Sequence, residues 1–323
     1  MKNFWTELPK PFVALAPLAD VTDAAFRRII AKYSKPASFV MYTEFVAADG
    51  LCLAPEPGKQ KLMRDLVFSE AERPIVAQFF TCHPEHMEKT AALAEELGFD
   101  GVDINMGCPA GPVNNQGAGA ELIKTPAVAQ ELIAAAKRGA PNLPVSVKTR
   151  LGYHKDILEE WLPALLAAKP AVITIHARTR KEMSKVPARW ERVKRAVEIR
   201  DELESDTLIV GNGDVQDLPD ARAKAVASGV DGVMLGRAIF GRPWLFDESK
   251  HPELPERLRI AVEHAELFEE LLGDIKNFAI MKKHFKAYAE GFPGAKELRM
   301  KLMETENAAQ INKVIEEFLA DRI

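Results

Sequence analysis

The chain has 323 residues, of which 47% are hydrophobic and 28% charged, and a formal net charge of −4. This is ordinary for a globular protein and allows one large domain with a smaller one. No apolar run approaches the roughly 20 residues that cross a bilayer, and the N-terminus lacks a signal-peptide pattern. Three scattered cysteines are too few for a disulfide framework or a zinc site. We therefore expect a cytoplasmic protein without a membrane segment or metal.

Eight short apolar runs alternate with helical patterns along the first part of the chain. Apolar runs separated by amphipathic stretches such as residues 84–98 and 127–140 are typical of parallel strands covered by helices. Eight units in about 240 residues predict an α/β fold, a (β/α)8 TIM barrel, and leave a doubly wound open sheet as the alternative. The expected strands are residues 12–19, 39–45, 74–80, 101–107, 144–150, 171–178, 207–214 and 232–237.

Two parts of the chain depart from this repeat. Residues 46–73 mix turn residues with a short helical piece, which makes the second unit irregular. From about residue 248 onward only helical periodicity is found, interrupted by Gly291, Pro293 and Gly294. We therefore expect a barrel domain over residues 1–247 and an all-α helical bundle over residues 248–323.

Polar and small residues gather where the expected strands end. In a barrel of this kind the active site lies at the carboxyl ends of the strands. A single lysine or histidine there is more often a rim residue than a catalyst, but their presence at nearly every strand end favours a site. They are Pro17–Ala19, Glu44, Gln78, Asn105 with Cys108, Lys148 with Arg150, His176 with Arg178, Asn212–Asp214, and Gly236 with Arg237.

The last two strand ends carry glycines in the position where such barrels bind phosphate. Gly213 and Gly236 would let backbone N–H groups approach phosphate oxygens, and Arg237 could add a charge-assisted hydrogen bond. Two tight turns are the alternative reading of the same glycines.

Seven segments of the chain combine into one recognisable pattern. They are APLADVTDAAFRR (16–28), NMGCPAGPVNNQGAGAELI (105–123), VKTRLG (147–152), IHARTR (175–180), GNGDV (211–215), GVMLGRAIFGRPWLF (232–246) and MKKHFKAYAEGFPGAKELRMKL (281–302). In their order and spacing these segments together resemble the flavin-dependent tRNA-dihydrouridine synthases. This resemblance implies FMN over the barrel mouth, NADPH as reductant and a uridine of the tRNA D-loop as substrate.

The resemblance also implies roles for particular residues. The uracil would face Asn105, Arg150 and Arg178. Gly111 and Pro112 stand where family members often carry basic residues, and Asp20 replaces a glycine. The residues expected to bind the cofactor are Pro17, Leu18, Ala19, Gln78 and Lys148 along the flavin, and His176, Asn212, Gly213, Asp214, Gly236 and Arg237 along its ribityl chain and phosphate.

Cys108 is the expected catalytic residue. Reducing the C5–C6 double bond of uracil requires a hydride at C6, which reduced flavin can deliver, and a proton at C5 from the opposite face. An ordinary thiol has a pKa near 8.5 and is largely protonated at neutral pH. Cys108, between Gly107 and Pro109, is therefore predicted to be the general acid, with simple packing as the alternative.

Two basic segments stand out in an otherwise acidic protein. Residues 178–195 hold eight Lys and Arg against two Glu, and residues 274–301 hold seven against three acidic residues. They predict a phosphate-binding surface for tRNA, with two solvated faces as the alternative. A flavin barrel enzyme acting on a free pyrimidine or dihydroorotate, and a tRNA-binding factor with little turnover, remain the alternative functions.

Overall fold

The computed structural model describes residues 3–35 and 37–322, and its centre is a ring of eight parallel strands. The strands are hydrogen-bonded in the order β1-β8-β7-β6-β5-β4-β3-β2. The ring is closed beside Val40, whose O accepts the Leu15 N–H at 2.8 Å and whose N–H donates to Val13 O at 3.0 Å. The predicted TIM barrel is therefore confirmed, and the open-sheet alternative is wrong.

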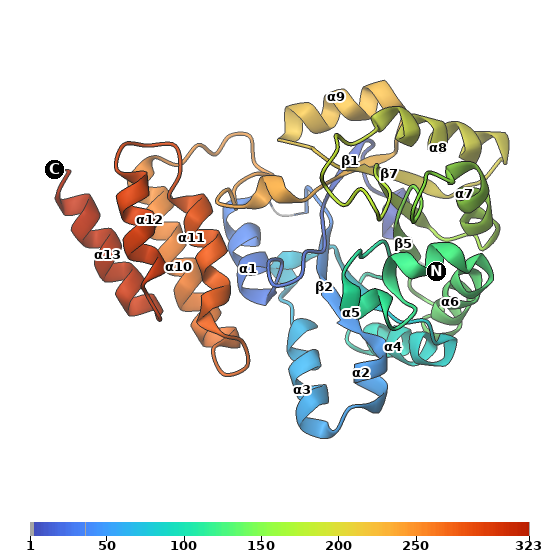
Figure 1. The fold of residues 1–323 in the computed structure, drawn as a ribbon, viewed down its shortest axis with the longest axis horizontal. Helices are drawn as coiled ribbons and strands as arrows, with labels where there is room; N and C mark the ends of the chain where they lie inside the picture. The colour runs from blue at the N-terminus through green and yellow to red at the C-terminus, as the bar shows by residue number, and fades with distance from the viewer. Residues whose placement is uncertain (1–2, 36, 323) are drawn as a thin grey trace.

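Helices cover the outside of this ring (Figure 1). The strands are β1 (Phe12–Leu15), β2 (Met41–Ala47), β3 (Ile75–Phe80), β4 (Gly101–Met106), β5 (Val145–Arg150), β6 (Val172–His176), β7 (Leu208–Asn212) and β8 (Gly232–Leu235). The covering helices are α1 (Ala24–Tyr33), α2 (Ala48–Leu53), α3 (Glu56–Asp65), α4 (Pro84–Glu96), α6 (Pro126–Gly139), α7 (Leu158–Ala167), α8 (Trp190–Glu202) and α9 (Leu218–Ser228).

Alternation along the strands separates two apolar cores. Inside the ring, Trp5 closes the amino-terminal end and packs in one cluster with Tyr42 and Met234. The opposite faces of the strands pack against the surrounding helices in a second, larger cluster. Because side chains alternate between the two faces, the inward residues near the carboxyl ends of the strands reach the mouth of the barrel.

The irregular second unit contains more helix than the sequence suggested. After β2 the chain forms α2, α3 and the 3-10 helix η2 (Glu70–Glu72). Pro55 directly precedes α3, which suits its fixed φ. Glu72, the last residue of η2, binds Arg27 of α1 in a fully buried ion pair of 2.7 Å. Several strands also end earlier than expected, because residues such as Pro17–Ala19 and Arg178 leave the sheet and enter the loops at the mouth.

The C-terminal helices lie beside the barrel at α1 (Figure 1). β8 is followed by η4 (Arg237–Ile239) and then by the helical segment, Leu254–Ala320. Its apolar residues belong to the same cluster as the outer core of the barrel. No helix within residues 3–35 and 37–322 is both long and apolar enough to cross a membrane. The segment consists of α10 (Leu254–Leu272), η5 (Phe278–Met281), α11 (Lys282–Tyr288), α12 (Ala295–Met303) and α13 (Ala308–Ala320).

Two buried histidines lie in this contact between α1 and the helical segment. The ring of His264 stacks on Phe26 with centroids 4.7 Å apart, and His284 meets His264 edge-on at 4.6 Å. Among the described residues, no hydrogen-bond partner meets Nε2 of His264 or either ring nitrogen of His284. Burial lowers the pKa of His264 to about 3 and lowers that of His284 well below its usual range. Both rings are therefore neutral in the folded protein.

These histidines should destabilise the fold in acid. The unfolded chain takes up a proton at His264 below about pH 6.5, whereas the folded chain resists it until about pH 3. We expect the parent to lose about 2 kcal/mol of unfolding free energy relative to a His264→Leu variant between pH 7 and pH 5. Urea unfolding at both pH values measures this difference.

The exposed His251 supplies the matched control. His251→Leu removes a histidine that stands outside the buried contact, and its unfolding free energy relative to the parent should change little with pH. A gap between parent and His264→Leu that is equal at pH 7 and pH 5 would contradict the role of the buried ring.

Candidate functional site

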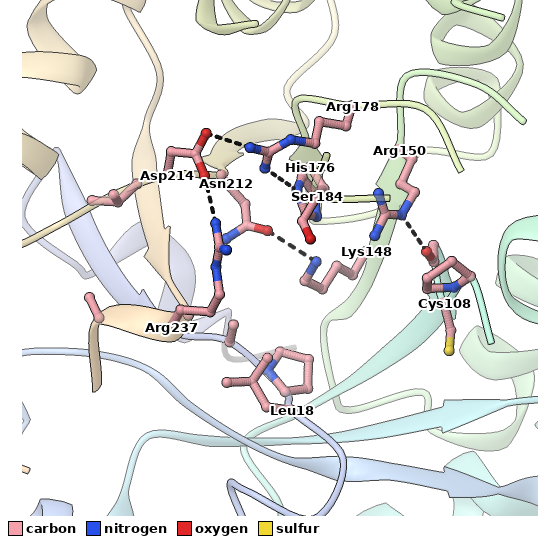
Figure 2. Close-up of a pocket in the computed structure, with 18 of the residues that line it drawn as sticks. Leu18, Cys108, Lys148, Arg150, His176, Arg178, Ser184, Asn212, Asp214 and Arg237 are labelled. Atoms are coloured by element: carbon pink, nitrogen blue, oxygen red, sulfur yellow. Dashed lines mark hydrogen bonds and ion pairs between the residues drawn. The ribbon is translucent and has the colours of Figure 1, made fainter. Parts of the chain in front are cut away.

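One cavity of about 910 Å³ opens at the carboxyl ends of the strands. This size suits a ligand as large as a cofactor. Figure 2 shows side chains from several strands pointing into it. Glu44 of the strand-end residues does not line it, but every residue predicted to act in catalysis or to bind the cofactor or the uracil does: Pro17, Leu18, Ala19, Gln78, Asn105, Cys108, Lys148, Arg150, His176, Arg178, Asn212, Gly213, Asp214, Gly236 and Arg237.

A chain of buried hydrogen bonds leads from the barrel interior to the cysteine loop. The carboxylate of Asp103 accepts a hydrogen bond from Gln78 Nε2 at 2.6 Å and another from the Ser146 hydroxyl. Gln78 Oε1 then accepts from Asn105 Nδ2 at 3.1 Å. Asn105 Oδ1 in turn accepts the Cys108 N–H at 2.9 Å. The amide of Asn105 therefore fixes the backbone at the point where β4 ends and the loop begins.

Cys108 is held in this loop as a protonated thiol. Burial is the main cause that raises its pKa, and the nearby Arg150 and Lys148 oppose the shift only in part. Figure 2 shows its sulfur directed away from the Arg150 guanidinium, and its side chain packs against a small apolar cluster that includes Phe80 and Val113. A thiol in this state can donate a proton at neutral pH, but it is a poor nucleophile.

Two arginines hold the carbonyl groups on either side of Cys108. Arg150 Nε donates to Gly107 O at 2.7 Å, and Arg180 Nη2 donates to Pro109 O at 3.2 Å. Nη1 of Arg150 also donates to Thr179 O and Met183 O in the loop after β6, at 3.2 and 3.1 Å. Arg150 thus ties the cysteine loop to a second loop of the mouth, a structural role that the sequence did not suggest.

Lys148 is the central cation of the cavity floor. Its Nζ donates to Asn212 Oδ1 at 3.3 Å (Figure 2). Burial lowers its pKa to about 8, the positive charge of Arg150 adds to this, and Asp103 opposes it. Lys148 remains mostly charged at neutral pH, and an anion entering the cavity would raise its pKa again, so the site favours ligands that carry or develop negative charge beside it.

A second group of cations surrounds Asp214 at the far side of the mouth (Figure 2). Arg178 pairs with Asp214 Oδ2, and Arg237 Nη2 lies 2.7 Å from Asp214 Oδ1. The hydrogen bond from Arg178 is the main cause that lowers the pKa of Asp214. This carboxylate therefore remains ionised and orients both guanidinium groups.

The tautomer of His176 follows from its neighbour. Arg178 Nη1 lies 3.1 Å from His176 Nε2, and a guanidinium can only donate, so Nε2 accepts and the proton is on Nδ1. Burial and the surrounding cations lower the pKa of His176 well below its usual range. A neutral His176 thus offers one N–H donor. Arg178 contacts His176 and Asp214, and its expected role toward the uracil stays a prediction.

The turn after β7 supports a close backbone approach to a ligand. Gly213 has a φ of +127°, a backbone region that favours glycine. A Cβ built there would lie 2.8 Å from the Cβ of Ala188, so a side chain would not fit without movement. Trp190 Nε1 donates to Gly213 O at 2.9 Å and fixes the turn.

The cavity also includes residues that the sequence did not single out. They come from β2, from the loops after β1, β4, β6 and β7, and from η4 and the residues after it, and some of them lie inside the segments that carry the family resemblance. Met183 is partly exposed with a positive φ of 57°, which helps the loop after β6 turn over the mouth. The additional lining residues are Ala16, Phe45, Gly107, Pro109, Met183, Ser184, Val215, Gln216, Asp217, Ala238 and Arg242.

Most arginines of the basic segment 178–195 are paired with carboxylates in the folded protein. Arg192 binds Asp156 at 2.8 Å and Glu159 at 2.7 Å, and Arg195 binds Glu202 at 2.6 Å. The segment therefore presents less free positive charge than its composition suggests. Its lysines, Lys181, Lys185 and Lys194, are exposed, and the phosphate-binding surface expected there stays a prediction.

Comparisons with known proteins agree along almost the entire chain. Residues 14–322 match the family model described as Dihydrouridine synthase (Dus). The chain is 42% identical over 325 residues to a "Probable tRNA-dihydrouridine synthase" of Staphylococcus aureus (strain COL), covering 99% of this chain and 96% of the relative. It is 43% identical over 320 residues to "Probable tRNA-dihydrouridine synthase 2" of Bacillus subtilis (strain 168), covering 98% and 97%.

Solved structures share the barrel with far lower sequence identity. Histamine dehydrogenase from Rhizobium sp. 4-9 aligns with a TM-score of 0.54 and 14% identity over 80% of this chain and 49% of that chain. The 6-hydroxypseudooxynicotine amine oxidase of Pseudomonas geniculata N1 aligns with a TM-score of 0.52 and 13% identity over 73% and 46%. The chain thus spans about half the length of these two structures, and the likeness shows the fold alone.

The role of Arg150 as a loop anchor can be tested directly. Replacing it by methionine retains much of the side-chain volume but removes the hydrogen bonds to Gly107, Thr179 and Met183. We expect amide hydrogen exchange over residues 105–114 and 179–186 to accelerate by on the order of tenfold, because charged donors to buried carbonyls contribute more than neutral ones. Exchange measured by mass spectrometry, peptide by peptide, reports this change.

Arg195→Met is the matched control, since it removes the same charge from ion pairs on the surface of α8. It should leave exchange in both loops unchanged. Parent-like exchange in the Arg150→Met loops would show that Asn105 and Arg180 hold the cysteine loop without Arg150.

Proposed function

The chain belongs to the dihydrouridine synthase family, and from this premise we propose that it is an FMN-dependent tRNA-dihydrouridine synthase. In this proposal it reduces the C5–C6 double bond of a uridine in the tRNA D-loop, with NADPH as the source of electrons. The proposal is carried by one observation: in a chain of this family, the protonated thiol of Cys108 lies at the rim of a cavity that is also lined by cationic side chains.

The cavity has features that fit a flavin mononucleotide. Its volume of about 910 Å³ is large enough, and the turn at Gly213 has no room for a side chain. Arg237 is about two-thirds exposed, so its guanidinium is available to a phosphate. When bound there, FMN would supply the two-electron chemistry, transfer of a hydride to C6 of the base.

Cys108 would act on the base as a general acid. Its raised pKa keeps the proton on sulfur at neutral pH until a carbanion-like C5 develops negative charge. The hydrogen bonds from Arg150 to Gly107 O and from the Cys108 N–H to Asn105 hold the thiol-bearing loop in position. Cys108 would therefore deliver the proton to C5, and the thiolate would regain a proton from solvent.

Other residues would orient and stabilise the flavin. Lys148 has a pKa of about 8, which a nearby anion would raise. It would bind near N1 and O2, where negative charge gathers on reduction. The Nδ1–H of His176 would donate to the same side or to the ribityl chain. Gln78 would use its remaining amide hydrogen and lone pair at the ring edge, while Asp214 keeps Arg178 and Arg237 directed toward the phosphate.

We also propose that the helical segment binds tRNA. Among the described residues no acidic side chain pairs with Lys286, Lys296 or Lys301, and all three are exposed. Lysines of this kind can neutralise phosphates, and those contacts would offset the few kcal/mol needed to move a base out of the tRNA structure. The domain division at residues 247 and 248 fits this assignment of the barrel to chemistry and the helices to tRNA.

Replacing Cys108 by alanine should abolish product formation without removing the flavin. The change is small and lies away from the cation cluster at Asp214, so FMN content and NADPH oxidation should stay near parent levels. Dihydrouridine formed in unmodified tRNA should fall by on the order of 10²-fold or more, because proton delivery to C5 is lost. Chromatography of digested tRNA measures the product, and absorbance measures the bound flavin.

Cys52→Ala is the control, since Cys52 lies on α2 and does not line the cavity. Cys82 is unsuitable because its Sγ lies 3.0 Å from Gln116 O in the loop that follows Cys108. Parent-rate dihydrouridine formation by Cys108→Ala would refute the general-acid role. Turnover of free uridine in preference to tRNA would instead favour a barrel enzyme that acts on a free pyrimidine.

Reversing three lysines tests the tRNA surface. The triple variant with Lys286, Lys296 and Lys301 changed to Glu should bind tRNA much more weakly, and its binding should depend less steeply on salt because fewer counterions are released. Affinity measured at two salt concentrations reports both changes, and FMN content should be unaffected. We expect a loss of about tenfold or more at low salt.

A second triple variant carries the same change of charge elsewhere. Lys61 and Lys89 are exposed on α3 and α4 of the barrel, and Lys250 is exposed on the segment that precedes α10. Changing them to Glu controls for the general effect of net charge. Equal losses in the two triple variants would mean that only overall charge matters, and no loss in either would place tRNA binding outside the helical segment.

A further inference from the structure

Strand β2 contains a bulge beside the cavity. In its pairing with β3, Tyr42 is opposite Val76 but Phe45 is opposite Gln78, so β2 has one more residue than β3 between these pairs. The Thr43 hydroxyl fills the gap, accepting the Gln78 N–H at 3.0 Å and donating to Glu44 O at 2.7 Å. Bulges of this type redirect side chains next to functional sites.

The bulge directs the side chains of Glu44 and Phe45 to different surroundings. Phe45 lines the cavity, whereas Glu44 does not and is almost fully buried on the side of the helical segment. Glu44 Oε2 accepts a hydrogen bond from Lys276 Nζ at 2.5 Å, and Lys276 lies between α10 and η5. Lys276 Nζ is also 2.8 Å from Asp65 Oδ1 at the end of α3.

The second oxygen of Glu44 reaches the turn that lines the cavity. Oε1 accepts the backbone N–H of Asp20, the residue directly after Pro17–Ala19. Asp20 has a φ of +54°, an uncommon value for a residue other than glycine, so this turn needs outside support to keep its shape. The Leu18 N–H makes a local hydrogen bond, donating to the Thr22 hydroxyl oxygen at 2.9 Å.

We propose that Glu44 is a positioning residue that holds the cavity-lining turn Pro17–Ala19 through the Asp20 N–H, and that Lys276 of the helical segment keeps Glu44 in that role. This inference rests on the proposed function, because the ligand of the turn is taken to be FMN. It adds that the helical segment supports the flavin site as well as a tRNA surface.

The charges around Glu44 explain why Lys276 is needed. Burial raises the pKa of Glu44 to about 7, the nearby Asp65 and Asp23 add to the shift, and Lys276 opposes it. Without the ammonium group the carboxyl would hold a proton at neutral pH and become a weaker acceptor for the Asp20 N–H. The charged groups that face this cluster are Asp20 after β1, Asp23 at the start of α1, Asp65 on α3, Lys276 before η5 and Lys283 on α11.

The test compares the FMN affinity of two variants of the full chain. Lys276→Met removes the partner of Glu44, while Arg64→Met removes the exposed ion pair of 2.8 Å to Asp274, which also joins α3 to the segment after α10. Titrating the flavin-free proteins with FMN and following flavin fluorescence gives the dissociation constant. We expect it to rise about tenfold for Lys276→Met and to stay within about twofold of the parent for Arg64→Met.

Two further measurements separate positioning from mere stability. Glu44→Gln keeps an oxygen for the Asp20 N–H, so the double variant Glu44→Gln with Lys276→Met should recover most of the lost affinity. In Lys276→Met alone the ratio of its dissociation constant to that of the parent should grow between pH 6.5 and pH 8.5, because the Glu44 carboxyl of the parent ionises near pH 7, whereas burial keeps that of the variant protonated to a higher pH. Neither effect follows from a purely structural ion pair, which would lower only the melting temperature of the flavin-free protein.

The outcomes distinguish this inference from the proposed function. Parent-like FMN affinity in both Lys276→Met and Glu44→Gln would overturn the positioning role alone. A parent protein that binds no FMN would overturn the proposed function and this inference with it.

Discussion

The buried carboxylate of Asp103 is the constraint on which the geometry of the mouth depends. A carboxylate accepts hydrogen bonds only, so Gln78 must turn its NH2 group toward Asp103 and its oxygen toward Asn105. Asn105 must then point its own oxygen at the N–H groups of the next loop, including that of Cys108. One charge inside the barrel therefore sets the orientation of two amides and the start of the cysteine loop. The burial of Asp103 raises its pKa to about 6, and the hydrogen bonds from Ser146 and Gln78 limit that rise.

Positive charge is concentrated at this mouth although the whole chain is acidic. Lys148 and Arg150 lie on one strand two residues apart and therefore point to the same side. Arg178 and Arg237 are brought together from different loops by a single carboxylate, Asp214. These cations repel one another, but each is held by hydrogen bonds or an ion pair to a fixed partner. An anionic ligand in the cavity would reduce the repulsion and stabilise the site.

The sequence predicted the barrel and the residues around its mouth because both follow local rules. Parallel strands appear as apolar runs, and their carboxyl ends meet at one edge. It could not predict contacts between distant segments. Arg192 pairs with Asp156 from the loop before α7, and Lys276, counted in the sequence as part of a basic surface, pairs with Glu44. The bulge in β2 was equally hidden, since one extra residue in a strand leaves no mark on an apolar run.

The contact between α1 and the helical segment has a consequence for how the chain is made. Phe26 and the apolar face of α1 are covered by residues of α10 and α11, more than 200 positions later, and Lys32 and Tyr33 bind Glu263 at 2.5 and 2.6 Å. A chain still emerging from the ribosome can complete all eight strands while this first helix remains uncovered. The nascent barrel would therefore expose the apolar face of α1 until synthesis is nearly finished. Exposed apolar surface of this kind is what chaperones bind, and the last step of folding would wait for the last segment of the chain.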